Sequence, residues 1–163
     1  KTKWFNQQYL RAKSKEDLAD KLQIILKENN IKMDNEFVAS VCHQLKERAT
    51  FVKDMWLEGA YYFAVPTTYD EKTIRKKWKE ETPRLLSELK IRLENISDFS
   101  SANIEIEFKK YLDDNDLGMG RLLPAFRLAL TGLGMGPSLF DIASLLGKNE
   151  TIKRMEIALK IIK

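Results

Sequence analysis

Arginine, proline and several glycines follow one another near the end of this sequence, among apolar residues at helical spacing. The run Leu117–Gly132 holds an apolar helical stretch and Arg127, and Gly136, Pro137 and Leu139 follow it. The apolar spacing predicts a helix that presents Arg127 as a cation, and Pro137 predicts the first turn of another helix. Free N–H groups at a helix N-terminus, beside an arginine, can hold a phosphate or the edge of an unstacked base. An ordinary helix–loop–helix corner with a surface arginine has the same pattern.

A second group of cations forms the densest basic run of the chain. It comprises Lys72, Arg75, Lys76, Lys77 and Lys79, all on one predicted helix. Such a run is usually a solvated helix face, and its functional interpretation is sequence-independent contact with phosphates. Arg75 and Lys76 are the candidates for contact with an RNA backbone. The formal net charge of +4 is too modest to indicate nucleic acid by itself.

Signatures of catalysis are absent from the sequence. It has no GxxxxGK loop, no GxGxxG after a strand, no HExxH and no GxSxG. The single Cys42 cannot form an internal disulfide, and with only His43 beside it lacks the companions of a Cys/His metal site. We therefore expect no catalytic residue, no metal and no cofactor within this sequence.

Length and composition indicate a folded protein of one domain or two small ones. The 163 residues are 44% hydrophobic and 32% charged, which suits a globular chain with a core. No apolar run is long enough for a membrane helix, and the N-terminus has no signal-peptide pattern. We expect a cytoplasmic monomer with no membrane or DNA partner. The chain starts at Lys1 and runs directly into a helix-like segment, which suggests a piece of a longer protein.

Helical periodicity runs through nearly every segment, so the predicted fold class is all-α. The uncharged stretch around Tyr61 and Pro66 indicates a connection between two consecutive helical subdomains, residues 1–70 and 71–163. The expected helix starts are Ser14, Asp34 or Asn35, Asp70, Thr82, Ser100 or Ser101, the glycines before Arg121, Pro137, and Asn149 or Thr151. The basic helix is expected to extend to about Glu80.

Several motifs, in this order, resemble the anticodon-binding end of bacterial glutamyl-tRNA synthetases. They are Lys3–Arg11, Glu47–Asp54, Tyr61–Phe63, Leu117–Gly132, Gly136–Phe140 and Leu145–Gly147. The resemblance covers essentially all of the chain. It implies two helical subdomains that bind the anticodon arm of a glutamate-accepting tRNA. It also implies a parent enzyme that attaches glutamate to that tRNA with ATP and magnesium, although the adenylate-forming His-Ile-Gly-His and Lys-Met-Ser-Lys-Ser motifs are absent here.

The resemblance also assigns roles to individual residues. Arg48 matches the arginine that reads the third anticodon base and helps to separate glutamate from glutamine tRNAs. Arg127 and the loop containing Gly136, Pro137 and Leu139 match the groups at the first anticodon base. An arginine fork can pair with a base edge and discriminate by roughly 1–3 kcal/mol.

Two of the matched positions have weaker chemistry. The family often has a hydroxyl-bearing residue where this chain has Gly136, so only the backbone can make a hydrogen bond there. Lys109 lies where the family has a basic residue against the anticodon arm, and a lysine offers a point charge for phosphate. An alternative function is a helical protein–protein docking domain, whose arginines would pair with acidic side chains.

Overall fold

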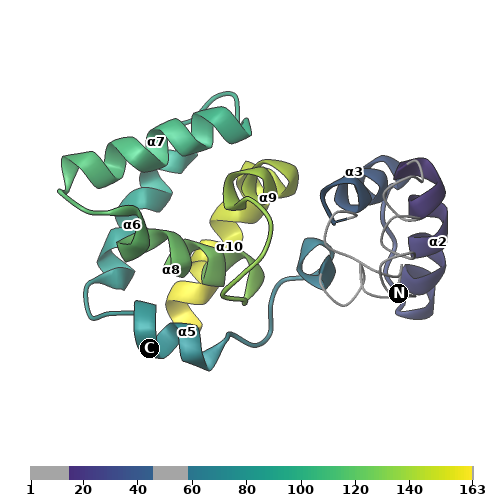
Figure 1. Cartoon of the computed structure of the whole chain (residues 1–163), viewed down its shortest axis with the longest axis horizontal. Helices are drawn as coiled ribbons and strands as arrows, with labels where there is room; N and C mark the ends of the chain where they lie inside the picture. The colour runs from purple at the N-terminus through teal and green to yellow at the C-terminus, as the bar shows by residue number, and fades with distance from the viewer. Residues whose placement is uncertain (1–14, 46–58, 163) are drawn as a thin grey trace, which may run out of the picture. The chain divides into compact units, whose positions relative to one another are not determined.

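The computed structural model describes residues 15–45 and 59–162. The chain forms two compact units, Lys1–Ala64 and Val65–Lys163, and each is described separately (Figure 1). All the described regular structure is helical, so the predicted all-α class is confirmed for this part of the chain. Within the same ranges, no helix is both long and apolar enough to cross a bilayer. The motifs Lys3–Arg11 and Glu47–Asp54, with Arg48, and the predicted cap Ser14 lie outside the described residues.

In the first unit, the apolar faces of two helices pack against each other. Helix α2 (Lys15–Glu28) and helix α3 (Asn35–Leu45) pack together, and the short 3₁₀ helix η1 (Ala60–Tyr62) follows. Their fully buried aliphatic residues recur at helical spacing: Leu18, Leu22 and Leu26 on α2, and Val38, Val41 and Leu45 on α3. Helix α2 ends at Glu28, and Asn30 then turns the chain with φ 59°.

The second unit contains six helices around one core. They are α5 (Glu71–Lys77), α6 (Thr82–Glu94), α7 (Ser101–Asp114), α8 (Met119–Thr131), α9 (Leu139–Leu146) and α10 (Lys148–Ile161). Helix α10 packs against α6, α8 and α9, while α5 lies against α8 and α7 against α9 (Figure 1). Phe108 of α7 lies between Phe126 and Phe140, at ring-centroid distances of 5.8 and 5.5 Å. This aromatic cluster joins α7, α8 and α9.

Several helix ends differ from the prediction. Helix α5 ends at Lys77 rather than near Glu80, because the backbone of Trp78 is extended. By contrast, the predicted helix start at the glycines before Arg121 is confirmed, because Gly118, with φ −85°, is the N-cap of α8 and Gly120 lies inside the helix. Helix α9 begins at Leu139, after the N-cap Ser138, and Pro137 therefore precedes the helix instead of forming its first turn.

The last helix also starts earlier than expected. Gly147, with φ 87°, is the N-cap of α10, in place of Asn149 or Thr151. Thr151 lies inside the helix and donates its hydroxyl hydrogen to the carbonyl oxygen of Ala143 at 3.2 Å. This bond ties α10 to α9 across their short connection.

Candidate nucleic-acid interface

The loop between α8 and α9, residues 132–138, is fixed at both ends. Gly132 ends α8 in the left-handed region, with φ 76°, and its N–H donates to the carbonyl oxygen of Leu128 at 2.8 Å. A Cβ atom added at Gly132 would lie 2.5 Å from the carbonyl oxygen of Thr68. Only glycine satisfies both the positive φ and this close backbone approach.

Arg127 holds the other end of the loop. Its Nη1 donates a hydrogen bond to the carbonyl oxygen of Pro137 at 2.8 Å. The hydroxyl of Thr131 donates to the carbonyl oxygen of Arg127 at 2.9 Å, and it accepts from the N–H of Leu133 at 3.1 Å. The half-buried Arg127 is therefore not the freely presented cation that the sequence predicts, because it fastens the loop to α8.

The structure brings Arg127, Gly136, Pro137 and Leu139 together at this corner. Gly136 and Pro137 are half-buried, so part of their surface remains accessible. Leu139 is only 2% exposed and belongs to the core at the start of α9. A ligand at this corner therefore meets the backbone near Leu139 rather than its side chain.

The basic helix α5 lies beside the same loop. Asp70 caps its N-terminus by accepting hydrogen bonds from the hydroxyl of Thr73 and from the N–H of Thr73, the latter at 3.0 Å. These two bonds, the hydroxyl first, hold the pKa of the Asp70 carboxyl below its usual value. The N–H of Asp70 donates to the carbonyl oxygen of Gly132 at 2.8 Å. Residues 65–70, predicted from the sequence as the end of the first subdomain, lie in the second unit, where Pro66, Thr68 and Asp70 approach Gly132 of the loop.

The candidate backbone contacts do not share one place. Lys76 lies on α5 and lines an open groove together with loop residues 133–135. Arg75 is exposed on the same helix but does not line that groove. Lys109 is exposed on α7, where its Nζ forms an ion pair with Glu105 Oε2 at 2.7 Å. Phosphate binding at Lys109 must therefore compete with an existing carboxylate partner.

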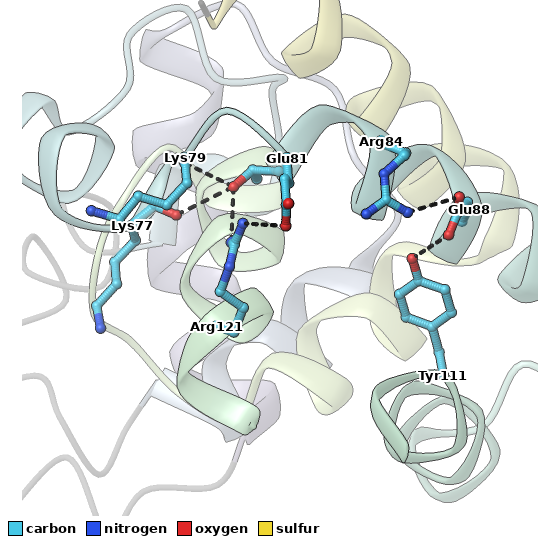
Figure 2. Close-up of polar contacts among 8 residues, drawn as sticks. Lys77, Lys79, Glu81, Arg84, Glu88, Tyr111 and Arg121 are labelled. Atoms are coloured by element: carbon cyan, nitrogen blue, oxygen red, sulfur yellow. Dashed lines mark hydrogen bonds and ion pairs between the residues drawn. The ribbon is translucent and has the colours of Figure 1, made fainter. Parts of the chain in front are cut away.

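The turn after α5 is held to α8 by polar contacts of Arg121, which points toward Lys79 and Glu81 (Figure 2). Arg121 Nη1 donates to Thr82 Oγ1 at 3.0 Å, and the N–H of Lys79 donates to the same oxygen at 2.8 Å. Arg121 Nη2 also lies 4.0 Å from Glu81 Oε2. These contacts fix where the basic helix ends relative to α8.

A second polar cluster joins α6 to α7 (Figure 2). Tyr111 donates its hydroxyl hydrogen to Glu88 Oε1 at 2.8 Å, and Arg84 Nη1 forms an ion pair with Glu88 Oε2 at 3.3 Å. The Tyr111 hydrogen bond is the main reason that the pKa of Glu88 lies below its usual value. Each oxygen of the carboxylate thereby has a structural partner, Tyr111 on Oε1 and Arg84 on Oε2.

Arg154 was missed by the sequence analysis. It is 2% exposed on α10, where Nη1 donates to the carbonyl oxygen of Leu130 at 2.8 Å and Nε donates to Glu150 Oε1 at 3.0 Å. Its helical spacing was a usable signal, because Arg154 lies between the buried Thr151 and Ala158 on one face of α10. It braces the end of α8 from which the loop departs.

Comparisons with known proteins agree on one family. The model of the family described as "Anticodon binding domain" matches residues 17–159. The glutamate–tRNA ligase of Phocaeicola vulgatus is 42% identical over 163 residues, and that of Flavobacterium johnsoniae is 45% identical over 159 residues. These matches cover 100% and 98% of this chain but 32% of each relative, so the chain spans about a third of their length.

The structural comparison agrees with the sequence comparison. The crystal structure of a glutamate tRNA ligase from Elizabethkingia meningosepticum, in complex with its amino acid, matches with a TM-score of 0.92 and 37% identity. The match covers 99% of this chain and 32% of that chain. The family model spans most of the sequence, and the solved relative shares the helical fold. The chain belongs to the anticodon-binding domain family, in the form found in bacterial glutamate–tRNA ligases.

Proposed function

We propose that this chain binds the anticodon arm of a glutamate-accepting tRNA, as the recognition part of a cytoplasmic glutamate–tRNA ligase. The observation that carries the proposal is the corner between α8 and α9, where Arg127 fastens the loop beside the basic helix α5. A rigid loop with accessible backbone and nearby cations suits splayed bases and their phosphates. The family match supports the same function and does not favour the docking-domain alternative.

The recognition residues divide into two chemical groups. Arg48 and Arg127 would read base edges, and Gly136, Pro137 and Leu139 would supply backbone and shape at the first anticodon base. Arg75, Lys76 and Lys109 would neutralise phosphates without regard to sequence. Attachment of glutamate, with ATP and magnesium, would belong to the part of the relatives that this chain does not cover.

Binding to two RNAs across a salt series tests the proposal. One RNA is unmodified glutamate tRNA, the other is the same tRNA with an altered anticodon, and the salt runs from about 50 to 200 mM. We expect tighter binding to the cognate anticodon at every salt concentration, with duplex DNA bound more weakly than either RNA. Equal affinities for both tRNAs that collapse together as salt rises would contradict the proposal.

Two variants locate the base-reading contact. Arg48→Ala should lower the affinity for the cognate tRNA more than the affinity for the altered tRNA, because it removes a contact to one base. The matched control is Arg84→Ala, which removes an exposed arginine that forms an ion pair on α6. An equal loss of affinity for both tRNAs in Arg48→Ala would exclude Arg48 as a base reader.

A further inference from the structure

An open groove of about 530 Å³ lies between α5 and the loop that follows α8. Its walls come from three places in the second unit. Lys72, Thr73, Lys76 and Lys77 lie on α5, Leu133, Gly134 and Met135 lie in the loop, and Asp70 and Pro124 complete the lining. The volume falls within the roughly 300–1,000 Å³ range of small-molecule sites.

The loop wall is apolar and unusually exposed. Met135 is 83% exposed and Leu133 is 42% exposed, and both line the groove. The half-exposed ring of Pro124 adds to the same wall. A methionine side chain is polarizable and adapts its shape to an aromatic partner. This wall therefore suits the flat face of an unstacked base.

The helix wall is cationic. One face of α5 lines the groove with residues 72, 73, 76 and 77, because positions three or four apart lie side by side on a helix. Three of these four residues are lysines. The carboxylate of Asp70 also lines the groove, but it is engaged by the backbone N–H of Thr73 at 3.0 Å. Three lysines against one carboxylate leave the wall with a positive charge, which complements a phosphate.

The groove is also held in shape before any ligand binds. A Cβ atom added at Gly134 would lie 2.3 Å from Thr73 Oγ1, so the loop and α5 are in close contact there. The hydrogen bond from Asp70 N–H to the carbonyl oxygen of Gly132 fixes the adjoining backbone. A preformed site reduces the ordering cost of binding.

From the apolar wall, the cationic wall and the contacts that join the loop to α5, we infer that this groove binds one unstacked nucleotide of the anticodon loop. The base packs on Met135 and Leu133, and its phosphate lies against Lys76 and Lys77. This nucleotide is a neighbour of the bases read at the Arg127 corner, since Leu133–Met135 belong to the same loop as Pro137. The inference rests on the proposed function, because it requires that RNA reaches this loop.

Four variants of the full chain test the inference. Met135→Ser removes the apolar wall at a solvent-exposed position, and Ile91→Ser is its control on α6, where the side chain is 58% exposed. Lys76→Gln removes one cation from the groove, and Lys160→Gln is its control at an exposed position of α10. Binding of glutamate tRNA is measured for each variant over a salt series, alongside the anticodon-altered tRNA.

The two groove variants should behave differently. Met135→Ser should weaken tRNA binding by about tenfold with an unchanged salt slope, because it removes a stacking surface and no charge. Lys76→Gln should also weaken binding, and it should reduce the salt slope by about one. The two control variants should bind as the unmodified chain does. A tRNA carrying 4-thiouridine in its anticodon loop should crosslink to the Leu133–Met135 segment in the unmodified chain.

The remaining outcomes separate the inference from the function on which it rests. Met135→Ser could keep both the anticodon preference and the affinity of the unmodified chain, with no crosslink to the Leu133–Met135 segment. That outcome would overturn the inference about the groove and would not affect the proposed function. Loss of anticodon preference in the unmodified chain would overturn both. A salt slope that falls equally in Met135→Ser and Lys76→Gln would also overturn the groove, because a purely apolar contact releases no counterions.

Discussion

The guanidinium of Arg154 caps the end of α8, because its Nη1 donates to the carbonyl oxygen of Leu130 at 2.8 Å. Carbonyl groups in the last turn of a helix have no partner within the helix. The buried guanidinium from α10 supplies the missing hydrogen bond to one of them. Burial lowers the pKa of Arg154, and the partly exposed Glu150 opposes that shift by pairing with Nε at 3.0 Å. The buried charge thus depends on partners from two helices.

Replacement of Arg154 by methionine should destabilise the second unit. The substitution keeps an apolar chain of similar reach but leaves the carbonyl of Leu130 without its buried donor, and we expect a loss of about 2–4 kcal/mol in the free energy of unfolding. Urea denaturation followed by circular dichroism measures it. Arg84→Met is the control, because Arg84 is 57% exposed in its ion pair with Glu88. Equal stabilities of the two variants would contradict a bracing role for Arg154.

The two glycines at opposite ends of α8 should respond in opposite ways to alanine. Gly132→Ala places a Cβ atom 2.5 Å from the carbonyl oxygen of Thr68 at a backbone φ of 76°, so it should cost about 2 kcal/mol or more. Gly120→Ala lies within the helix, where no atom outside the surrounding helix backbone comes within 4 Å of the new Cβ, so it should stabilise by about 0.5–1 kcal/mol. Thermal unfolding of both variants tests the contrast, and a shift in the same direction would refute it.

Arg127→Lys should separate loop anchoring from base reading. A lysine can still donate to the carbonyl oxygen of Pro137, but it lacks the planar fork that pairs with a base edge. We expect the preference for the cognate anticodon to fall about tenfold or more, with little change in stability. Affinities for glutamate tRNA and its anticodon-altered copy give the preference. An unchanged preference in this variant would limit Arg127 to holding the loop.

The cap of α5 predicts a pH dependence with a definite sign. Hydrogen bonds from Thr73 hold the folded-state pKa of Asp70 below the ordinary 3.8, so its charge contributes stability above that value. The contribution is lost as pH falls through the folded-state pKa. The difference in unfolding free energy between the unmodified chain and Asp70→Asn should therefore be largest near neutral pH and shrink toward pH 3. A difference that grows on acidification would contradict this assignment.

The thiol of Cys42 should be unreactive in the folded chain. It is fully buried on α3, and burial raises the pKa of the thiol to about 12. Reaction with a thiol reagent at pH 8 should be roughly a hundredfold slower or more in the native chain than in urea, because the thiolate is the reacting species. Equal rates in the two conditions would show that α3 opens readily. The same reaction then reports on opening of the first unit.

The sequence predicted the helices and their faces because helical spacing and caps are local signals. Ser100 is the N-cap of α7 and accepts from the N–H of Asn103 at 3.2 Å, as its position before an apolar repeat predicted. Helix α8 ends at the C-cap Gly132, the last residue of the run Leu117–Gly132 in which the apolar spacing predicted a helix. These features depend on residues three or four apart, which a single sequence displays directly.

The site was predicted less completely, because its geometry depends on contacts between distant segments. The bond from Arg127 to Pro137 follows from the direction in which the loop turns, and no local pattern encodes it. The groove beside Lys76 requires knowing that residues 133–135 return to α5. Arg154 was also missed, because a charged residue is ordinarily assigned to the exposed face of an amphipathic helix. The roles of Arg48, Arg127 and Lys109 in reading RNA remain predictions.

The close approach of Gly132 to Thr68 has a consequence for protein engineering. The loop after α8 takes its shape from residues 66–73 as much as from its own sequence, through the Thr68 carbonyl, the Asp70 N–H and the Thr73 side chain. Grafting residues 127–139 alone onto another helical scaffold would remove the contacts with residues 66–73 that hold the loop in its conformation. A transplant that keeps these contacts must be discontinuous, because it has to carry residues 66–73 together with the loop after α8.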